Sequence, residues 1–334
     1  LEWNLPAGGV LTSGYEYEIE NVTTGRSWTV AYPQHSLLDQ DVEPGKVYQY
    51  RMLAKNHVGS SAYTAPVSAL TLPAAVQNLA VYPVDREAAV ANVKFDPAES
   101  ADKYHIAVTE NTSKQLVYES TVTTATYQPI QNLQPGVNYT IQVTPENGSG
   151  RGAASSVGFL SLPAAPGQFS AIQINMDGIR LGWTSVTSAT YYELQRDRET
   201  IYGGPELTYR DIGLESGTEY GFEIAAKNDT GYGEKSELAN VITLPAWTTV
   251  TAATYETERI TLQWMSVKGA ASYVVGVDGQ EVGTVTAATY GTLQNYEITG
   301  LNPGVTYRFS LKPENRSGSG EETYVDASTL PEAI

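Results

Sequence analysis

Histidines are the first residues to consider for chemistry, because imidazole is a common metal ligand and general base. The chain has three of them, His35, His57 and His105, and their spacing matches no metal-binding motif. Cysteine is absent, which removes thiolate ligands, a cysteine nucleophile and disulfide bonds. We therefore expect no metal centre built on histidine or cysteine.

Carboxylates offer a second route to chemistry, as calcium ligands or as acid–base groups. The clusters at Asp39–Asp41 and Asp278–Glu281 match no EF-hand loop, and neither recurs along the chain. A calcium site there remains an alternative. Gly-rich phosphate loops, the Gly-x-Ser-x-Gly elbow and His-Glu-x-x-His are all missing. We therefore predict a non-enzyme without catalytic residues, cofactor or metal.

Tyrosine is the unusual component, with 23 residues in a chain of 334. An exposed tyrosine can stack on a sugar or anchor a protein interface at low entropic cost. We name Tyr63, Tyr202 and Tyr232 as candidate partner contacts in loops. The alternative is that most tyrosines are ordinary strand residues, since tyrosine is a good strand former.

Charge and composition exclude several classes of protein. The chain carries 37 acidic and 20 basic side chains, a formal net charge of −17. Such a chain repels phosphate backbones, so we expect no nucleic-acid partner. Hydrophobic residues make up 41%, enough to form cores, and no apolar run is long enough to span a membrane. The first residue, Leu1, indicates a mature piece or a fragment.

One sequence unit is repeated four times, which indicates repeated domains. In each copy an apolar residue and a glycine-containing turn precede a tyrosine, and these tyrosines are 81 to 91 residues apart. That spacing suits a small sandwich domain. The four tyrosines, predicted to be structural, are Tyr48, Tyr139, Tyr220 and Tyr307.

After each of these tyrosines the sequence alternates between apolar and polar residues, which predicts a half-buried strand. An Asn-x-x-Gly motif follows, suited to a tight hairpin loop in which glycine takes a positive φ. The loop residues are Asn56 and Gly59, Asn147 and Gly150, Asn228 and Gly231, and Asn315 and Gly318.

An apolar-x-aromatic signature lies upstream in each copy and predicts inward-facing core residues. The aromatic residues are Trp3, Phe95, Trp183 and Trp264. A strand that begins with tyrosine follows, at Tyr17, Tyr104, Tyr192 and Tyr273. Each copy ends in Leu-Pro, and proline cannot donate to a sheet ladder. We therefore predict domains at 1–73, 74–163, 164–245 and 246–334, joined by short connectors into an elongated, semi-rigid row.

At these residues the chain resembles a tandem array of fibronectin type III domains. The resemblance implies an all-β fold of four seven-stranded immunoglobulin-like sandwiches, with each corner tyrosine bonded to nearby backbone through its hydroxyl. Departures are Phe95 in place of tryptophan, Ser216 in place of the corner proline and Val42 in place of the corner leucine. The cysteine-free, Thr/Ala-rich style is similar to bacterial extracellular arrays of this family.

Repeat one departs further, because only two residues precede Trp3 and the first strand of its sandwich is missing. Two explanations are open. The chain is part of a longer array, or another chain donates the missing strand.

We expect a non-enzymatic extracellular array that spaces other modules or mediates adhesion at a cell surface. Its partners would be proteins or polysaccharides, or neighbouring copies of itself. One alternative is a structural subunit of a filament or phage-like tail, assembled by repeat packing or strand donation. Another is an accessory carbohydrate-binding array of a secreted polysaccharide-degrading enzyme.

Overall fold

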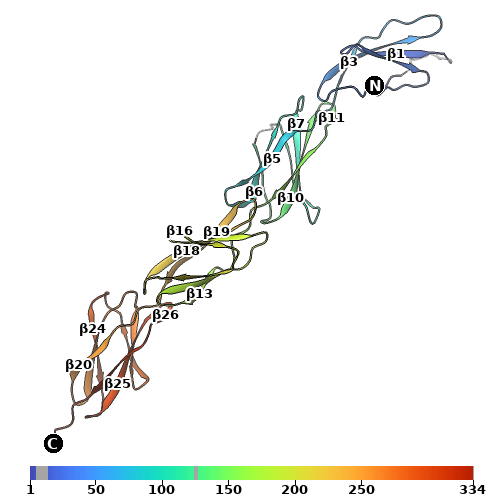
Figure 1. Cartoon of the computed structure of the whole chain (residues 1–334). Coiled ribbons are helices and arrows are strands. Elements are labelled where there is room, and N and C mark those ends of the chain that lie inside the picture. The colour runs from blue at the N-terminus through green and yellow to red at the C-terminus, as the bar shows by residue number, and fades with distance from the viewer. Residues whose placement is uncertain (5–13, 124–126, 334) are drawn as a thin grey trace. The chain divides into compact units, whose positions relative to one another are not determined.

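The computed structural model describes residues 1–4, 14–123 and 127–333, and their regular secondary structure is entirely β. Figure 1 shows strands throughout and no helix in this part of the chain. The all-β prediction is therefore confirmed, and no helix of the described residues could cross a membrane. The chain divides into two compact units, residues 1–161 and 162–334.

Repeat two, in the first unit, folds as two packed antiparallel sheets. The smaller sheet has the order β5-β6-β9, with β5 Gln77–Val84, β6 Glu87–Asp96 and β9 Tyr127–Ile130. The larger sheet has the order β11-β10-β7-β8, and β12 also pairs with β10. Its strands are β7 Lys103–Glu110, β8 Leu116–Val122, β10 Asn138–Asn147, β11 Gly150–Arg151 and β12 Ser155–Leu160. Taking β11 and β12 as one interrupted strand, the sandwich has seven strands.

Repeat three, in the second unit, has the same arrangement. Its smaller sheet is β13-β14-β17, with β13 Ser170–Ile174, β14 Gly178–Gly182 and β17 Thr208–Ile212. Its larger sheet is β16-β15-β18-β19, with β15 Tyr191–Arg196, β16 Glu199–Gly204, β18 Glu219–Lys227 and β19 Tyr232–Ile242.

Repeat four follows the same plan. Its smaller sheet is β20-β21-β24, with β20 Val250–Tyr255, β21 Arg259–Met265 and β24 Leu293–Thr299. Its larger sheet is β23-β22-β25-β26, and β27 also pairs with β25. The strands are β22 Ser272–Val277, β23 Gln280–Thr286, β25 Thr306–Asn315, β26 Gly318–Ser319 and β27 Thr323–Ser328.

Repeat one differs, because its described residues form a single four-stranded sheet of order β2-β1-β3-β4. The strands are β1 Glu16–Asn21, β2 Arg26–Ala31, β3 Val47–Lys55 and β4 Val67–Leu70. On the opposite side, the described chain contributes one bridge, between Glu2 and Ser36. A cavity of about 230 Å³ lined by Trp3, Ile19 and Met52 lies beside it.

Each repeat has its own hydrophobic core, which in repeats two to four forms where alternate residues of the two sheets face each other. Trp264 is 2% exposed, Trp183 6% and Phe95 2%, so the predicted aromatic positions of repeats two to four are buried. Trp3 is only partly buried and packs against Tyr17.

Every sheet lies within one of the four predicted repeats. The division between the two units falls at Ser161 and Leu162, beside the second Leu-Pro pair.

Candidate functional site

The corner tyrosines organise one turn in every repeat. The hydroxyl of each accepts a hydrogen bond from the backbone N–H five residues earlier, as the family resemblance implies. The donor N–H groups belong to Glu43 for Tyr48 (2.8 Å), Gln134 for Tyr139 (2.7 Å), Glu215 for Tyr220 (3.0 Å) and Asn302 for Tyr307 (2.8 Å). Each corner tyrosine is therefore a structural residue, because its hydroxyl holds the backbone of the turn that precedes it.

A second set of tyrosines supports the loop at the opposite end of the same sheet. Tyr104, Tyr192 and Tyr273 each accept a hydrogen bond from the backbone N–H six residues earlier, at 3.0, 2.9 and 2.7 Å. The sequence analysis placed these residues on strands but missed this loop contact. The constant six-residue offset could have indicated it.

The Asn-x-x-Gly loops are held by their own asparagine side chains. The amide oxygen of Asn147 accepts from the N–H of Ser149, and that of Asn315 accepts from the N–H of Ser317, both at 2.9 Å. Asn56 and Asn228 make the same contact with the residue two positions later, at 2.9 and 3.0 Å. The self-bonded side chain explains why asparagine recurs there.

The glycines of these loops follow the prediction with one exception. Gly150, Gly231 and Gly318 have φ of 133°, 153° and 138°. Gly59 does not adopt a positive φ, so the prediction is wrong at this position. In repeat one the loop is closed by a single bridge between Lys55 and Ser60. In repeats two and four a short paired strand closes it instead. The turn of repeat one closes without a left-handed residue.

A hydroxyl residue directly before each Leu-Pro pair was missed by the sequence analysis. Its side chain ties the last strand to the corner turn of its own repeat by accepting one backbone N–H and donating to one backbone C=O. In repeat one, Thr71 Oγ1 accepts from Lys46 N (2.9 Å) and donates to Glu43 O (2.8 Å). Ser161, Thr243 and Thr329 make the equivalent pairs of bonds. The recurring Ser/Thr-Leu-Pro triplet was the available signal.

Tyr63 lies in the loop between β3 and β4, on the outward face of the sheet of repeat one. Its hydroxyl donates to Glu18 (2.9 Å), and the guanidinium of Arg51 lies 4.2 Å from its ring centroid. The bond to the Glu18 carboxylate raises the pKa of the Tyr63 phenol. The ring is half-buried, so a partner would meet its edge together with two charged neighbours.

Tyr232 has a similar environment in repeat three, but it is the first residue of β19 and not a loop residue, which corrects the sequence interpretation. Its hydroxyl donates to Glu193 (3.3 Å), and Lys227 lies 4.9 Å from the ring centroid. In repeat four the exposed Tyr324, which the sequence analysis did not select, lies 4.6 Å from the guanidinium of Arg308. A cation over a tyrosine therefore recurs on three outer sheet faces, and such contacts are favourable.

Tyr202 does not lie in a loop, which corrects the sequence interpretation. It belongs to β16 and is half-buried, with ring centroids 6.2 Å from Trp183 and 5.1 Å from Tyr209. Its hydroxyl accepts from the N–H of Glu206 at 2.9 Å. Strand pairing between β15 and β16 turns the ring toward the core of repeat three.

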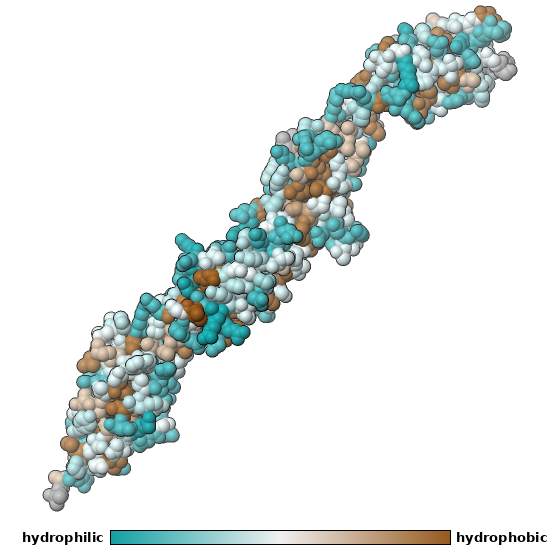
Figure 2. Space-filling model, in the orientation of Figure 1, coloured by the Kyte–Doolittle hydropathy of each residue, from teal (hydrophilic) through white to brown (hydrophobic). Residues whose placement is uncertain are grey.

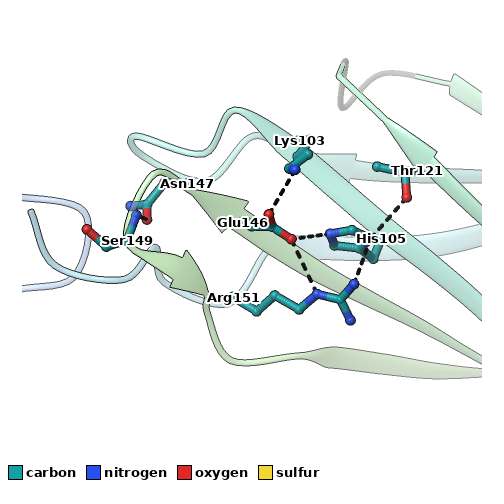
Figure 3. Close-up of polar contacts among 7 residues, drawn as sticks. All are labelled: Lys103, His105, Thr121, Glu146, Asn147, Ser149 and Arg151. Atoms are coloured by element: carbon teal, nitrogen blue, oxygen red, sulfur yellow. Dashed lines mark hydrogen bonds and ion pairs between the residues drawn. The ribbon is translucent and has the colours of Figure 1, made fainter.

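The outer face of repeat two carries a cluster of charged residues around one carboxylate (Figure 3). Glu146, at the end of β10, accepts from Lys103 (2.8 Å), Arg151 (3.3 Å) and His105. The other ring nitrogen of His105 faces Thr121 Oγ1 at 3.0 Å and the guanidinium of Arg151 at 3.3 Å. Antiparallel pairing of β7 with β10 brings Lys103 and Glu146 directly opposite each other.

This cluster is unsuited to acid–base catalysis. Lys103, with smaller effects of His105 and Arg151, lowers the pKa of Glu146 to about 2. A carboxylate with so low a pKa is a poor base at neutral pH. The Ser149 hydroxyl drawn in Figure 3 donates to Leu70 O at 2.7 Å. The arrangement is a surface ion-pair network.

Two of the carboxylates considered above as alternative calcium ligands, Asp39 and Asp278, accept hydrogen bonds from the protein itself. Asp39 accepts from the Tyr50 hydroxyl at 2.8 Å, and Asp278 accepts from the N–H of Arg308 at 2.9 Å. The described residues contain no group of three or more His, Cys, Asp or Glu side chains arranged to hold a metal ion.

Residues 74–159 match the family model of the fibronectin type III domain. This segment is therefore a fibronectin type III domain, and repeats three and four repeat its strand order. A search of known proteins finds mouse fibronectin type III domain-containing protein 7, 25% identical over 75% of this chain and 34% of that protein. Human neogenin is 25% identical over 99% of this chain and 26% of its own length. The netrin receptor DCC of rat is 24% identical over 98% and 26%.

The chain thus spans a quarter to a third of the length of these relatives. All three are animal proteins, so the expectation of a bacterial-type array finds no support in them. Among solved structures, the FN1–FN3 domains of chicken CNTN1 align with a TM-score of 0.29 and 14% identity, over 77% of this chain and 99% of that one. A two-domain segment of chicken tenascin aligns with a TM-score of 0.32 and 16% identity, over 50% and 99%.

Proposed function

We propose that the chain is a non-enzymatic, extracellular array of four fibronectin type III repeats that spaces other modules and contacts a protein partner at a cell surface. The repeats would occupy 1–73, 74–163, 164–245 and 246–334. The observation that carries the proposal is the recurrence of one sandwich plan with a charged, tyrosine-bearing outer sheet face. Relatives named as receptors, such as the netrin receptor, support the cell-surface assignment.

The outer faces suit recognition of a protein more than of a polysaccharide. A sugar-stacking platform needs an open aromatic face, whereas a cation already lies over Tyr63 and over Tyr232. On the side in view, Figure 2 shows small hydrophobic areas separated by hydrophilic ones rather than one large apolar patch. Such a surface fits a partner bound through charge complementarity and a few aromatic contacts.

The test is binding of the purified chain to cell-surface proteins by proximity labelling on animal cells, with a parallel pull-down on insoluble polysaccharides. We expect protein partners whose capture falls when Tyr63→Ala or Tyr232→Ala is introduced. Tyr202→Phe serves as a control, because its half-buried ring supports the core of repeat three. Binding to polysaccharide alone, lost in the same two variants, would refute the proposal and favour an accessory carbohydrate-binding array.

A second candidate, a filament subunit that accepts a strand from another copy, is favoured by the cavity of repeat one. The cavity is lined by apolar side chains that include Trp3, Ile19 and Met52. Light scattering after size exclusion decides between the two functions. A mass that grows with concentration would support the filament, and a constant monomer mass would reject it.

A further inference from the structure

The Asn-x-x-Gly loop of repeat two reaches out of its own sandwich. The side-chain amide of Asn147 donates to the backbone carbonyl of Thr71 at 2.9 Å, across 76 positions of sequence. Asn147 is 4% exposed, so this bond is shielded from water. Next to it, the hydroxyl of Ser149 donates to Leu70 O at 2.7 Å. Both acceptors belong to the end of repeat one.

The same contact occurs independently in the second unit. The amide of Asn315, in repeat four, donates to the carbonyl of Thr243 at 2.9 Å. Thr243 lies two residues before Pro245, as Thr71 lies two residues before Pro73. Beside this contact, Arg316 pairs with Glu219 at 2.6 Å and Lys268 with Glu215 at 2.7 Å. Because the same contact occurs in both units, we expect it to have the same structural role in each.

Glycines allow the close approach that these bonds require. A Cβ added at Gly152 would overlap the carbonyl oxygen of Pro73, and one at Gly320 would overlap that of Pro245. A Cβ on Gly150 would lie 3.3 Å from a methyl group of Leu72, and one on Gly318 would lie 3.2 Å from the equivalent methyl of Leu244. The leucine and proline of each connector therefore pack against glycines that follow the asparagine.

The threonine before each of these Leu-Pro pairs bonds both to the corner turn of its own repeat and to the asparagine of the next repeat. The hydroxyl of Thr71 is bonded to the corner turn of repeat one, while its carbonyl accepts the amide of Asn147 from repeat two. Thr243 does the same between repeats three and four. The corner turn, the connector and the loop of the next repeat are therefore linked by one continuous hydrogen-bond network.

We propose that Asn147 and Asn315 act as latches, each of which locks its repeat in one orientation on the Thr-Leu-Pro end of the preceding repeat. With the latch closed, the two repeats of a unit move as one body. With the latch open, the connector becomes a hinge. Function as a spacer would then depend on a single side-chain amide in each unit.

The test exchanges the donor for an acceptor. In Asn147→Asp the carboxylate keeps the oxygen that accepts from Ser149 N, so the loop retains its cap. The second oxygen now faces the Thr71 carbonyl, and the two acceptors repel each other. The control is Asn138→Asp, which adds the same charge at an exposed position of the same strand, β10.

Because the chain lacks cysteine, spin labels can be placed at two chosen sites of the full chain. Cysteines at the exposed Leu38 and Leu116 report on repeats one and two, and cysteines at Ile212 and Leu293 report on repeats three and four. Double electron–electron resonance then measures the distribution of distances within each unit. We expect Asn147→Asp to raise the open population about 5- to 150-fold, the effect of leaving one shielded acceptor without its donor.

The two latches should respond separately. Asn147→Asp should broaden only the Leu38–Leu116 distribution, and Asn315→Asp only the Ile212–Leu293 distribution. Ser149→Ala, which removes a flanking bond without adding charge, should broaden the first distribution less and serves if Asn147→Asp fails to fold. Unchanged distributions in all three variants, or equal broadening in Asn138→Asp, would overturn the proposal. Loss of partner binding with unchanged distances would concern the proposed function and not the latch.

Discussion

At the scale of single residues, the tyrosines divide into classes by what their hydroxyls contact. The four corner tyrosines, together with Tyr104, Tyr192 and Tyr273, accept backbone N–H groups and hold turns. Tyr63 and Tyr232 instead donate to carboxylates on an outer face. Of these two classes, only the second lies on an outer sheet face. The abundance of tyrosine therefore has two separate explanations.

The corner bond can be tested with Tyr139→Phe. The ring is 1% exposed and stays in place, while the N–H of Gln134 loses its acceptor. We expect repeat two to lose about 1–3 kcal/mol of unfolding free energy. Urea unfolding followed by NMR signals of β10 measures this. Tyr127→Phe, at a 56% exposed position of the same repeat, should change little. Equal effects of the two changes would contradict the assignment.

The core aromatic residues give a second prediction. Trp264→Ala should cost about 3–5 kcal/mol, because it empties a large volume in a packed core. Trp264→Phe should cost less, since the indole N–H has no hydrogen-bond partner and Phe95 fills the equivalent place in repeat two. Trp247→Ala, at a 54% exposed position, is the control. Calorimetry of the full chain resolves the effect, and an unchanged melting transition in Trp264→Ala would refute the core assignment.

At the scale of elements, the pairing of β7 with β10 decides the electrostatics of repeat two. It places Glu146 opposite Lys103 and two residues from Thr144, the partner of His105. Neither neighbour is close in sequence. The ion-pair network is thus a product of strand register rather than of a local motif.

The network predicts a pH dependence with a definite sign. The pKa of Glu146 is about 2 in the folded chain and 4.5 in the unfolded chain. Its stabilising effect is therefore present above pH 4.5 and is lost as the pH falls from 4.5 toward 2. In Glu146→Gln this part of the acid destabilisation of repeat two should disappear. Urea midpoints from NMR signals of β7 at several pH values test this, with Glu119→Gln as control. An identical acid profile in Glu146→Gln and wild type would argue against it.

At the scale of the whole molecule, the chain consists of two compact units with one internal joint described in each. Each joint combines an asparagine bond with surface ion pairs, such as Lys46 with Glu99 and Arg316 with Glu219. Surface pairs of this kind contribute little each and are screened by salt. Geometry at the joints should therefore depend mainly on the asparagine bonds.

Small-angle X-ray scattering tests the expectation of an extended array. A net charge of −17 disfavours self-association at low ionic strength. We expect a monomer whose radius of gyration exceeds that of a compact globule of 334 residues, about 20 Å, and does not change with concentration. Measurements at physiological salt remove interparticle repulsion from the data. A radius of gyration near the compact value would reject the spacer function.

The sequence alone predicted four repeats, the all-β fold implied by the family resemblance, the corner tyrosines and the asparagine loops. These features depend on patterns within a few residues of one another, such as period-two alternation and a turn that precedes Tyr139 or Tyr220. Short-range hydrogen bonds stabilise the corner turns and the asparagine loops, and the corresponding residues recur in every copy.

Only the tertiary structure decided which polar groups meet across long separations. It turned Tyr202 inward, surrounded Glu146 with three cationic or imidazole side chains, and joined Asn147 to Thr71. Each outcome depends on the pairing of strands or the packing of successive repeats, so the sequence around a residue does not name its distant partner. The residues of the proposed latches can be found in the sequence, but the contacts between them are seen only in the structure.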